Sequence, residues 1–252
     1  MNVYLIASTN IHQIEMARYL ANVGGNSWAP NSESGGEQLI EFMGRLCYRS
    51  WAPGLNPNVT KVRDDSAAYL ANIIQSGHGS VLEHVWASFI FADVSRVFTH
   101  ELVRHRVGTA ISQESLRFVR VEKLDLPVPS VIREDMDSLY AFWAAEEQLE
   151  SAYRNLVEKM GIEDMATFAD KKEATSAARR VLPMGLPTTI GWSANLRTLR
   201  HVIESRTAPH AEEEIRMVFD EVASLALENW PLIFGDYDRL PGGIWVTNHP
   251  KV

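Results

Sequence analysis

The sequence predicts an α+β protein in which a small central β-sheet is flanked by long helices. Two observations predict this fold class. Strand-like runs are few and short, whereas the segments with helical periodicity are long. The run 82–92 is apolar on both faces, as expected of an interior strand. A third observation concerns domains: the 252 residues contain no internal repeat, low-complexity tract or linker, so we expect a single domain over residues 1–252.

The N-terminal half is expected to alternate short strands with helices. Apolar spacing places Cys47 on the buried face of one helix, and Ser66 is a candidate cap for the next, which Gly77 ends. The expected elements are a strand at 3–7, a loop at 29–36, a helix at 37–50, a loop at 51–61, a helix at 66–76, a strand at 82–92, and a helix from Asp93 or Ser95 to about Arg106.

The C-terminal half is dominated by helical patterns. Prolines mark an extended connection at 127–129, and Asn195 is a candidate N-cap. The expected elements are helices at 135–160 and 163–182, a strand at 187–194, a helix after Asn195, and a last helix at 211–229.

Composition excludes several classes of protein. The formal charge of −8 argues against a general nucleic-acid binder, which would carry a basic surplus. Cys47 is the only cysteine, so an internal disulfide is impossible, which fits a reducing compartment. The sequence shows neither the pattern of a secretory signal nor an apolar run long enough to span a membrane. We therefore expect a cytoplasmic protein that binds neither membrane nor nucleic acid.

Common catalytic signatures are absent from the sequence. It contains no phosphate-binding P-loop, no dinucleotide-binding glycine fingerprint and no nucleophile elbow. His100-Glu101 resembles the start of a zinc motif, but the next histidine, His105, lies five positions on rather than four. A helix would not direct those two imidazoles at one ion, so no metal site is expected.

The densest cluster of cationic and polar residues lies between 101 and 117. Arg104, His105 and Arg106 are adjacent, and Gly108 makes the following segment loop-like. Helical spacing places Glu101, Arg104 and His105 along one face. Arginine's planar fork suits phosphate and the edge of a uracil ring. The segment therefore predicts an anion site, and the alternative is a solvated, charged helix end.

Two further clusters are weaker when each is considered alone. In the helix after Asn195, Arg197 and Arg206 are nine positions apart and nearly opposite, so they would serve different ligands or subunits. The alternative is a surface helix whose arginines pair with nearby glutamates. The turn 77–84 carries glycines that allow close approach of a ligand, and its alternative is a simple helix stop with two turn histidines.

Together these segments resemble the flavin-dependent thymidylate synthases. The similarity extends from about Leu39 to Phe234, and four blocks match in order and separation. They are Gly77-His78 with Leu82-Glu83-His84, Arg104-His105-Arg106 followed by Ser112 to Phe118, Ala178 to Pro183, and Asn195-Leu196-Arg197 followed by His201, Arg206 and His210. One departure is that the stretch between Arg106 and Ser115 is one residue longer than the family pattern. Contacts of flavin or substrate with that stretch are where this chain would differ.

The resemblance implies a role for each matching residue. Ser80, Glu83, Arg104, His105, Arg106, Gln113, Asn195, Arg197, His201 and His210 would contact FAD, with His105 stacking on or orienting the flavin. Glu101, Arg104, Gln113, Glu114, Ser115, Leu116, Arg117, Arg179 and Arg206 would hold dUMP. Arg206 would be the activating, catalytic residue, because a guanidinium at the uracil edge stabilises negative charge developing at N3 and O4.

The resemblance also implies the reaction and the assembly. NADPH would reduce FAD, and the methylene group of 5,10-methylenetetrahydrofolate would be passed to dUMP and reduced to give dTMP. The family forms homotetramers whose active sites lie between subunits. A buried, unreactive Cys47 agrees with uracil methylation that needs no cysteine nucleophile. Two rivals stay open: a flavin-dependent pyrimidine nucleotide hydroxymethylase, suggested by the extra residue, and a non-enzymatic nucleotide- or RNA-binding module.

Overall fold

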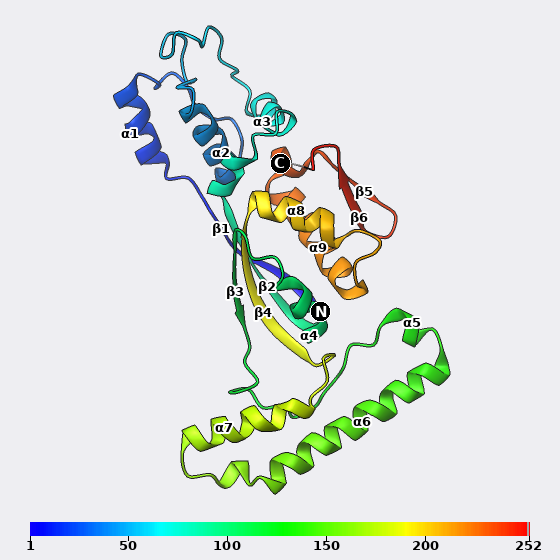
Figure 1. Cartoon of the computed structure of the whole chain (residues 1–252). Coiled ribbons are helices and arrows are strands. Elements are labelled where there is room, and N and C mark those ends of the chain that lie inside the picture. The colour runs from blue at the N-terminus through cyan, green and yellow to red at the C-terminus, as the bar shows by residue number, and fades with distance from the viewer. Residues whose placement is uncertain (251) are drawn as a thin grey trace. The chain divides into compact units, whose positions relative to one another are not determined.

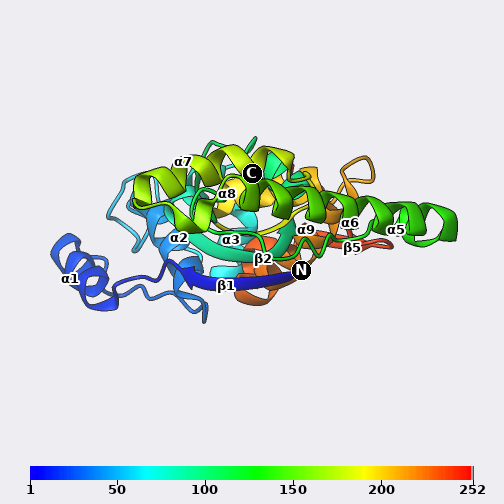
Figure 2. The same cartoon turned by 90° about the horizontal axis from the view of Figure 1, so that it is seen from below.

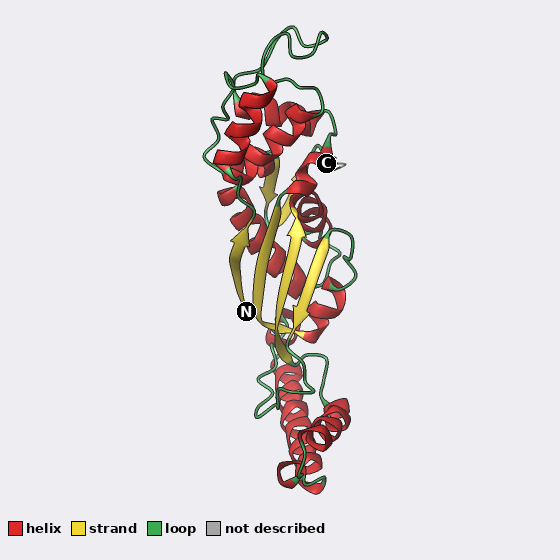
Figure 3. Ribbon diagram, turned by 90° about the vertical axis from the view of Figure 1, so that its left-hand side faces the viewer, coloured by secondary structure: helices red, strands yellow, loops and turns green. Residues whose placement is uncertain are grey.

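The main sheet of the computed structural model, which describes residues 1–250 and 252, has four strands. Their order is β1 (Asn2–Ser8), β2 (Trp86–Ser95), β4 (Pro187–Asn195) and β3 (Thr109–Gln113) (Figure 3). The strand predicted at 82–92 is therefore interior, as its two apolar faces require. A separate antiparallel hairpin pairs β5 (Tyr237–Leu240) with β6 (Ile244–Thr247). The α+β class is confirmed.

Helices account for many more residues than strands do (Figure 1). They are α1 (Gln13–Val23), α2 (Gly35–Leu46), α3 (Ser66–Gln75), α4 (Arg96–Leu102), α5 (Ser130–Arg133), α6 (Met136–Lys159), α7 (Phe168–Ala178), α8 (Leu196–Arg206), α9 (Glu213–Asn229) and α10 (Pro231–Phe234), with short 3-10 helices η1 (Gly79–His84), η2 (Ile162–Asp164) and η3 (Arg179–Val181). The helix predicted at 163–182 is thus broken into η2, α7 and η3. Among the described helices, none is long and apolar enough to cross a membrane.

Residue contacts divide the chain into two compact units. The first unit comprises Met1–Asn2, Phe91–Arg104 and Ile111–Gly191, and the second comprises Val3–Ile90, His105–Ala110 and Trp192–Val252. Each strand of the main sheet contributes residues to both units. The expectation of a single domain stays a prediction.

Each unit buries its own apolar side chains. In the first, α6 and α7 pack together with the short helices η2 and η3 (Figures 1 and 2). Their core holds Tyr153, Ile162, Ala174 and Ala178. In the second, α8 and α9 pack against each other. The ring of Trp192 there meets the ring of Phe219 edge to face at 5.7 Å.

Two helix starts show which capping predictions hold. The Oδ1 of Asn195 accepts a hydrogen bond from the backbone N–H of Thr198 at 2.8 Å, so Asn195 caps α8 as predicted. For α3 the prediction was wrong, because Asp65 is the cap and its carboxylate accepts from the first-turn N–H groups. The hydroxyl of Ser66 instead turns into the protein and donates to a buried carboxylate of Glu41 at 2.5 Å.

The buried face of α2 is charged, which the apolar spacing did not predict. Glu37, Ile40, Glu41, Gly44 and Arg45 are buried, and they follow one another at helical spacing. The guanidinium of Arg45 donates to a carboxylate oxygen of Glu41 at 2.7 Å, and both side chains are at most 1% exposed. Pairing makes this burial tolerable.

Cys47 follows the last turn of α2 and is exposed, so its predicted burial was wrong. Its thiol lies 3.7 Å from the carbonyl oxygen of Met43. The error has a clear cause: the predicted apolar face and the face that is buried differ, because ion pairing allows charged side chains to occupy the interior.

Candidate functional site

Arg104 and Arg106 lie beyond the C-terminal end of α4 and not on the helix. The helix ends at Leu102, and the backbone N–H of Arg104 bonds to the carbonyl of Glu101 at 3.2 Å in a tight final turn. The predicted helical face joining Glu101, Arg104 and His105 is therefore wrong. The segment after Gly108 is also not a loop, because β3 begins at Thr109.

In the second unit, His105 meets the C-terminal end of α8. The Nε of Arg206 donates to Nε2 of His105 at 2.7 Å, across 101 positions of sequence. The ring of His201 lies edge to face against the imidazole, with 6.3 Å between centroids. Burial, with smaller contributions from the nearby Arg206 and His201 in the same direction, lowers the pKa of His105 to about 4. The imidazole is therefore neutral at physiological pH.

The start of α8 is tied to the turn that follows Arg106. The backbone N–H of Asn195 donates to the carbonyl of Gly108 at 3.1 Å. The hydroxyl of Thr198 donates to the carbonyl of Val107 at 3.0 Å. Gly108 has φ +67°, and a Cβ there would lie 2.3 Å from the side-chain nitrogen of Asn195. The close approach of this turn to α8 thus requires glycine.

Replacing Gly108 with alanine is expected to destabilise the protein by more than the roughly 1–2 kcal/mol that a left-handed backbone costs an L-residue. The added methyl group also collides with Asn195 and Thr198, whose atoms lie within 2.4 Å. Urea unfolding measures the loss. Gly54→Ala is the matched control, because its φ is +87° and its Cβ would meet nothing within 4 Å. Equal losses in the two variants would refute the packing argument.

The turn 77–84 and the first turn of α8 are joined by an ion pair. The Nη1 of Arg197 lies 2.6 Å from a carboxylate oxygen of Glu83, and both side chains are more than 40% exposed. A Cβ at Gly79 would lie 2.9 Å from Nε of Arg197. Arg197 and Arg206 therefore contact different side chains, and the expectation that they serve different ligands or subunits stays a prediction. Ser80, in the same turn as Glu83, is exposed to solvent.

In the first unit, Glu114 is anchored at three points. Its backbone N–H donates to the carbonyl of Thr189 at 3.0 Å, and its carboxylate accepts from the N–H of Thr189 at 3.1 Å. Its carbonyl accepts from Nη2 of Arg96 at 3.3 Å. Nearby, the side-chain amide of Gln113 donates to the hydroxyl of Thr99 at 3.4 Å. The start of the segment assigned to dUMP is thus held in a defined conformation.

Arg96 contacts Glu114 and is a further candidate site residue, although none of the sequence motifs includes it. Burial lowers its pKa, and the positive charge of Arg179 lowers it further, while Glu114 opposes both effects. Its Nε is buried and has no hydrogen-bond partner. A signal was available: a basic residue in the first turn of a helix opposes the helix dipole and calls for a local reason.

The remaining predicted residues differ in their exposure to solvent. Arg104, Arg106, Arg117, His201 and His210 are exposed, whereas Glu101, Ser115, Leu116 and Arg179 are partly buried. Within the first unit, the hydroxyl of Ser115 accepts from the backbone N–H of Arg117 at 3.3 Å. The predicted residues thus fall into one set in each unit.

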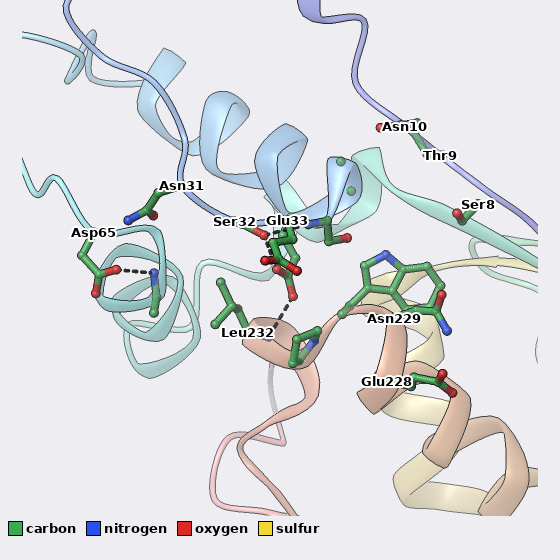
Figure 4. A pocket seen from close by; sticks show the side chains of 17 residues that line it. Ser8, Thr9, Asn10, Asn31, Ser32, Glu33, Asp65, Glu228, Asn229 and Leu232 are labelled. Atoms are coloured by element: carbon green, nitrogen blue, oxygen red, sulfur yellow. Dashed lines mark hydrogen bonds between the residues drawn. The ribbon is translucent and has the colours of Figure 1, made fainter.

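One cavity of about 580 Å³ lies in the second unit, and no predicted site residue lines it. Polar residues of 31–37, at the start of α2, surround it together with the end of β1 and the start of α10 (Figure 4). Glu33, Glu37, Asp65 and Glu228 are among the described lining residues, and no lysine or arginine is. Burial raises the pKa of Glu37 despite hydrogen bonds from Ser32 and Leu232. The lining does not suit a phosphate.

The elements define a helix-rich α+β protein with arginines of the predicted site in both units. The chain belongs to the family described as thymidylate synthase complementing protein, which matches residues 31–232. Among its relatives, the flavin-dependent thymidylate synthase of Mycobacteroides abscessus is 37% identical over 238 residues, covering 89% of each chain. That of Corynebacterium glutamicum is 39% identical over 231 residues, again covering 89% of each.

A solved structure supports the fold. The crystal structure of the UMP/dUMP methylase PolB from Streptomyces cacaoi, bound with 5-Br dUMP, superposes with a TM-score of 0.65. It covers 93% of each chain at 17% sequence identity. At this identity the likeness concerns the fold alone.

Proposed function

We propose that this protein is a flavin-dependent thymidylate synthase that methylates dUMP to dTMP. FAD is the cofactor, 5,10-methylenetetrahydrofolate is the methylene donor and NADPH is the reductant. The enzyme acts in the cytoplasm as a homotetramer with active sites formed by several subunits. One observation carries the proposal: His105 of the signature segment and Arg206 of α8, far apart in sequence, are hydrogen-bonded at 2.7 Å. Two of the blocks that define the resemblance therefore meet in space.

Most of the groups proposed to bind FAD belong to the second unit, whereas Arg104 and Gln113 belong to the first. Arg197, Arg106 and Ser80 offer exposed cationic and hydroxyl groups, which match a pyrophosphate. Gly79 is a close-packed glycine beside the Arg197 guanidinium, where a side chain would intrude. Asn195, Glu83, His201 and His210 complete the proposed set with Gln113, Arg104 and His105. When bound, reduced flavin supplies the hydride that completes the methyl group.

The protein's own contribution to chemistry is orientation and electrostatics. Arg206 is the proposed catalytic residue, and its guanidinium faces the uracil edge and stabilises negative charge developing at N3 and O4. Glu101, Arg104, Gln113, Glu114, Ser115, Leu116, Arg117 and Arg179 bind the rest of dUMP. The three-point anchoring of Glu114 orders the backbone of this segment before substrate arrives, which lowers the entropic cost of binding.

Product identification tests the proposal. Purified protein is supplied with FAD, NADPH, methylenetetrahydrofolate and dUMP, and the nucleotide product is determined by mass. Formation of dTMP, with NADPH oxidation that depends on dUMP, is the expected result. Hydroxymethyl-dUMP as the only product would make the protein a hydroxymethylase. A colourless protein that takes up no FAD would refute the flavoenzyme.

Replacing Cys47 with alanine is expected to leave dTMP formation at the wild-type level. The thiol is exposed, so burial does not keep it from reacting, but activation of uracil by Arg206 makes a cysteine nucleophile unnecessary. Activity is measured beside thermal unfolding, and maleimide labelling of the wild type verifies that the thiol is accessible. A folded but inactive Cys47→Ala protein would show that the mechanism uses the thiol.

A further inference from the structure

The contact between His105 and Arg206 has a direction that defines the state of both side chains. Nε of an arginine is always a donor, so Nε2 of His105 must be the acceptor at 2.7 Å. The imidazole is then neutral and carries its proton on Nδ1. The pKa of His105 is about 4, because burial and, to a smaller extent, the neighbouring Arg206 and His201 lower it. This value agrees with a neutral imidazole.

His105 is itself held in place from two sides. Its carbonyl accepts a hydrogen bond from the hydroxyl of Thr109 at 2.8 Å. Its ring lies against the ring of His201 at 6.3 Å and 68°. Because its backbone and one edge of its ring are held, His105 can fix the position of Arg206.

We propose that His105 is a positioning residue that sets the orientation of the Arg206 guanidinium toward the pyrimidine of dUMP. By accepting the Nε–H, it fixes the rotation of the guanidinium plane and hence the direction of the two Nη groups. This inference rests on the proposed function of Arg206 in uracil activation. It gives His105 a task at the substrate, in addition to the flavin contact that the resemblance implies.

The choice of acceptor has a chemical reason. A carboxylate in this position would hold Arg206 as firmly, but its negative charge would offset the charge of the guanidinium. A neutral imidazole supplies the hydrogen bond without adding a negative charge beside the guanidinium, whose positive charge is to act on the oxygen and nitrogen of the ring, where negative charge develops. Histidine kept neutral by burial and by the adjacent cation meets both requirements.

Three substitutions separate this role from packing and from charge. His105→Gln keeps an acceptor near the position of Nε2, His105→Phe keeps a planar ring without an acceptor, and His105→Glu supplies a charged acceptor. Each is measured for kcat and KM with dUMP, for dUMP affinity by calorimetry, for FAD content by absorbance and for thermal stability. His12→Phe is the control, since His12 is exposed and its side chain does not cap α1.

Positioning predicts a specific order. His105→Phe lowers kcat by about tenfold to a hundredfold, as expected when a reacting group is misplaced, with FAD content near that of the wild type. His105→Gln retains most of kcat, and His105→Glu falls below it although an acceptor is present. If the Gln and Phe variants lose kcat equally, or if they lose FAD and nothing else, the positioning role is refuted.

A double-mutant cycle gives the decisive test. Because His105 acts through Arg206, adding His105→Phe to Arg206→Ala should cost no further kcat or dUMP affinity. Additive losses would overturn the inference. A wild-type enzyme that makes no dTMP would refute the proposed function instead, and the cycle is then judged on dUMP affinity alone.

Discussion

Replacing Arg206 with alanine is expected to lower kcat for dTMP formation by about 10²- to 10³-fold, the usual loss when one preorganised donor to a developing anion is removed. Arg206 lies at the C-terminal end of α8 and donates a hydrogen bond to His105. In the proposed mechanism, its removal would leave the negative charge developing at uracil N3 and O4 without a stabilising cation. Steady-state kinetics with dUMP, on protein whose FAD content has been verified, measure the loss.

Two companion variants sharpen this result. Arg206→Lys keeps the charge but loses the Nε–H and the planar fork, so an intermediate kcat is expected. Arg154→Ala removes a 70% exposed arginine paired with Glu150 and is expected to change nothing. An Arg206→Ala enzyme that turns over at a rate close to the wild-type rate would place the activating charge elsewhere.

Replacing Arg45 with alanine is expected to lower the free energy of unfolding by about 3–5 kcal/mol, the cost of leaving a buried charge unpaired. Glu41 would lose its ion pair at 2.7 Å, and the carbonyl of Ser50 would lose the donor that lies 2.8 Å away. The guanidinium also stacks 4.3 Å from the ring centre of Tyr69. Urea unfolding followed by circular dichroism measures the loss.

Arg18→Ala is the matched control for this experiment. Arg18 pairs with Glu15 at 3.5 Å, but the two side chains are 73% and 59% exposed, so a change within about 0.5 kcal/mol is expected. Combining Arg45→Met with Glu41→Leu should recover part of the loss, because no charge is then left unpaired. Arg45→Ala as stable as Arg18→Ala would contradict the buried pairing.

The sequence was a good guide where a pattern is local. The cap at Asn195 follows from a side chain that can accept from its own helix, and the bounds of α6 follow from a capping aspartate and a long periodic segment. The interior position of β2 follows from two apolar faces. The roles assigned to the blocks that contain Glu83, His105 and Arg206 stay predictions.

Long-range pairing is what the sequence could not show. The buried face of α2 depends on an ion pair and on a hydroxyl from α3, neither of which leaves a periodic apolar signal. Gly108 and Thr109 suggest a turn, so the sequence predicts a loop where the structure has β3. The strand forms there because it pairs with β4. The hydrogen bond from Arg96 to the carbonyl of Glu114 likewise joins residues eighteen positions apart.

The anchors on either side of β3 bear on the extra residue between Arg106 and Ser115. Gly108 is tied to Asn195, and Glu114 is tied to Thr189, so the five residues of β3 run between two fixed points. Side chains of a strand alternate between faces, and one residue is half of that repeat. Deleting one residue from this strand would therefore exchange the faces of the sheet on which Ser112 and Gln113 lie, unless a bulge absorbed the change. Sequence comparisons within the family should align this strand from its two anchors inward.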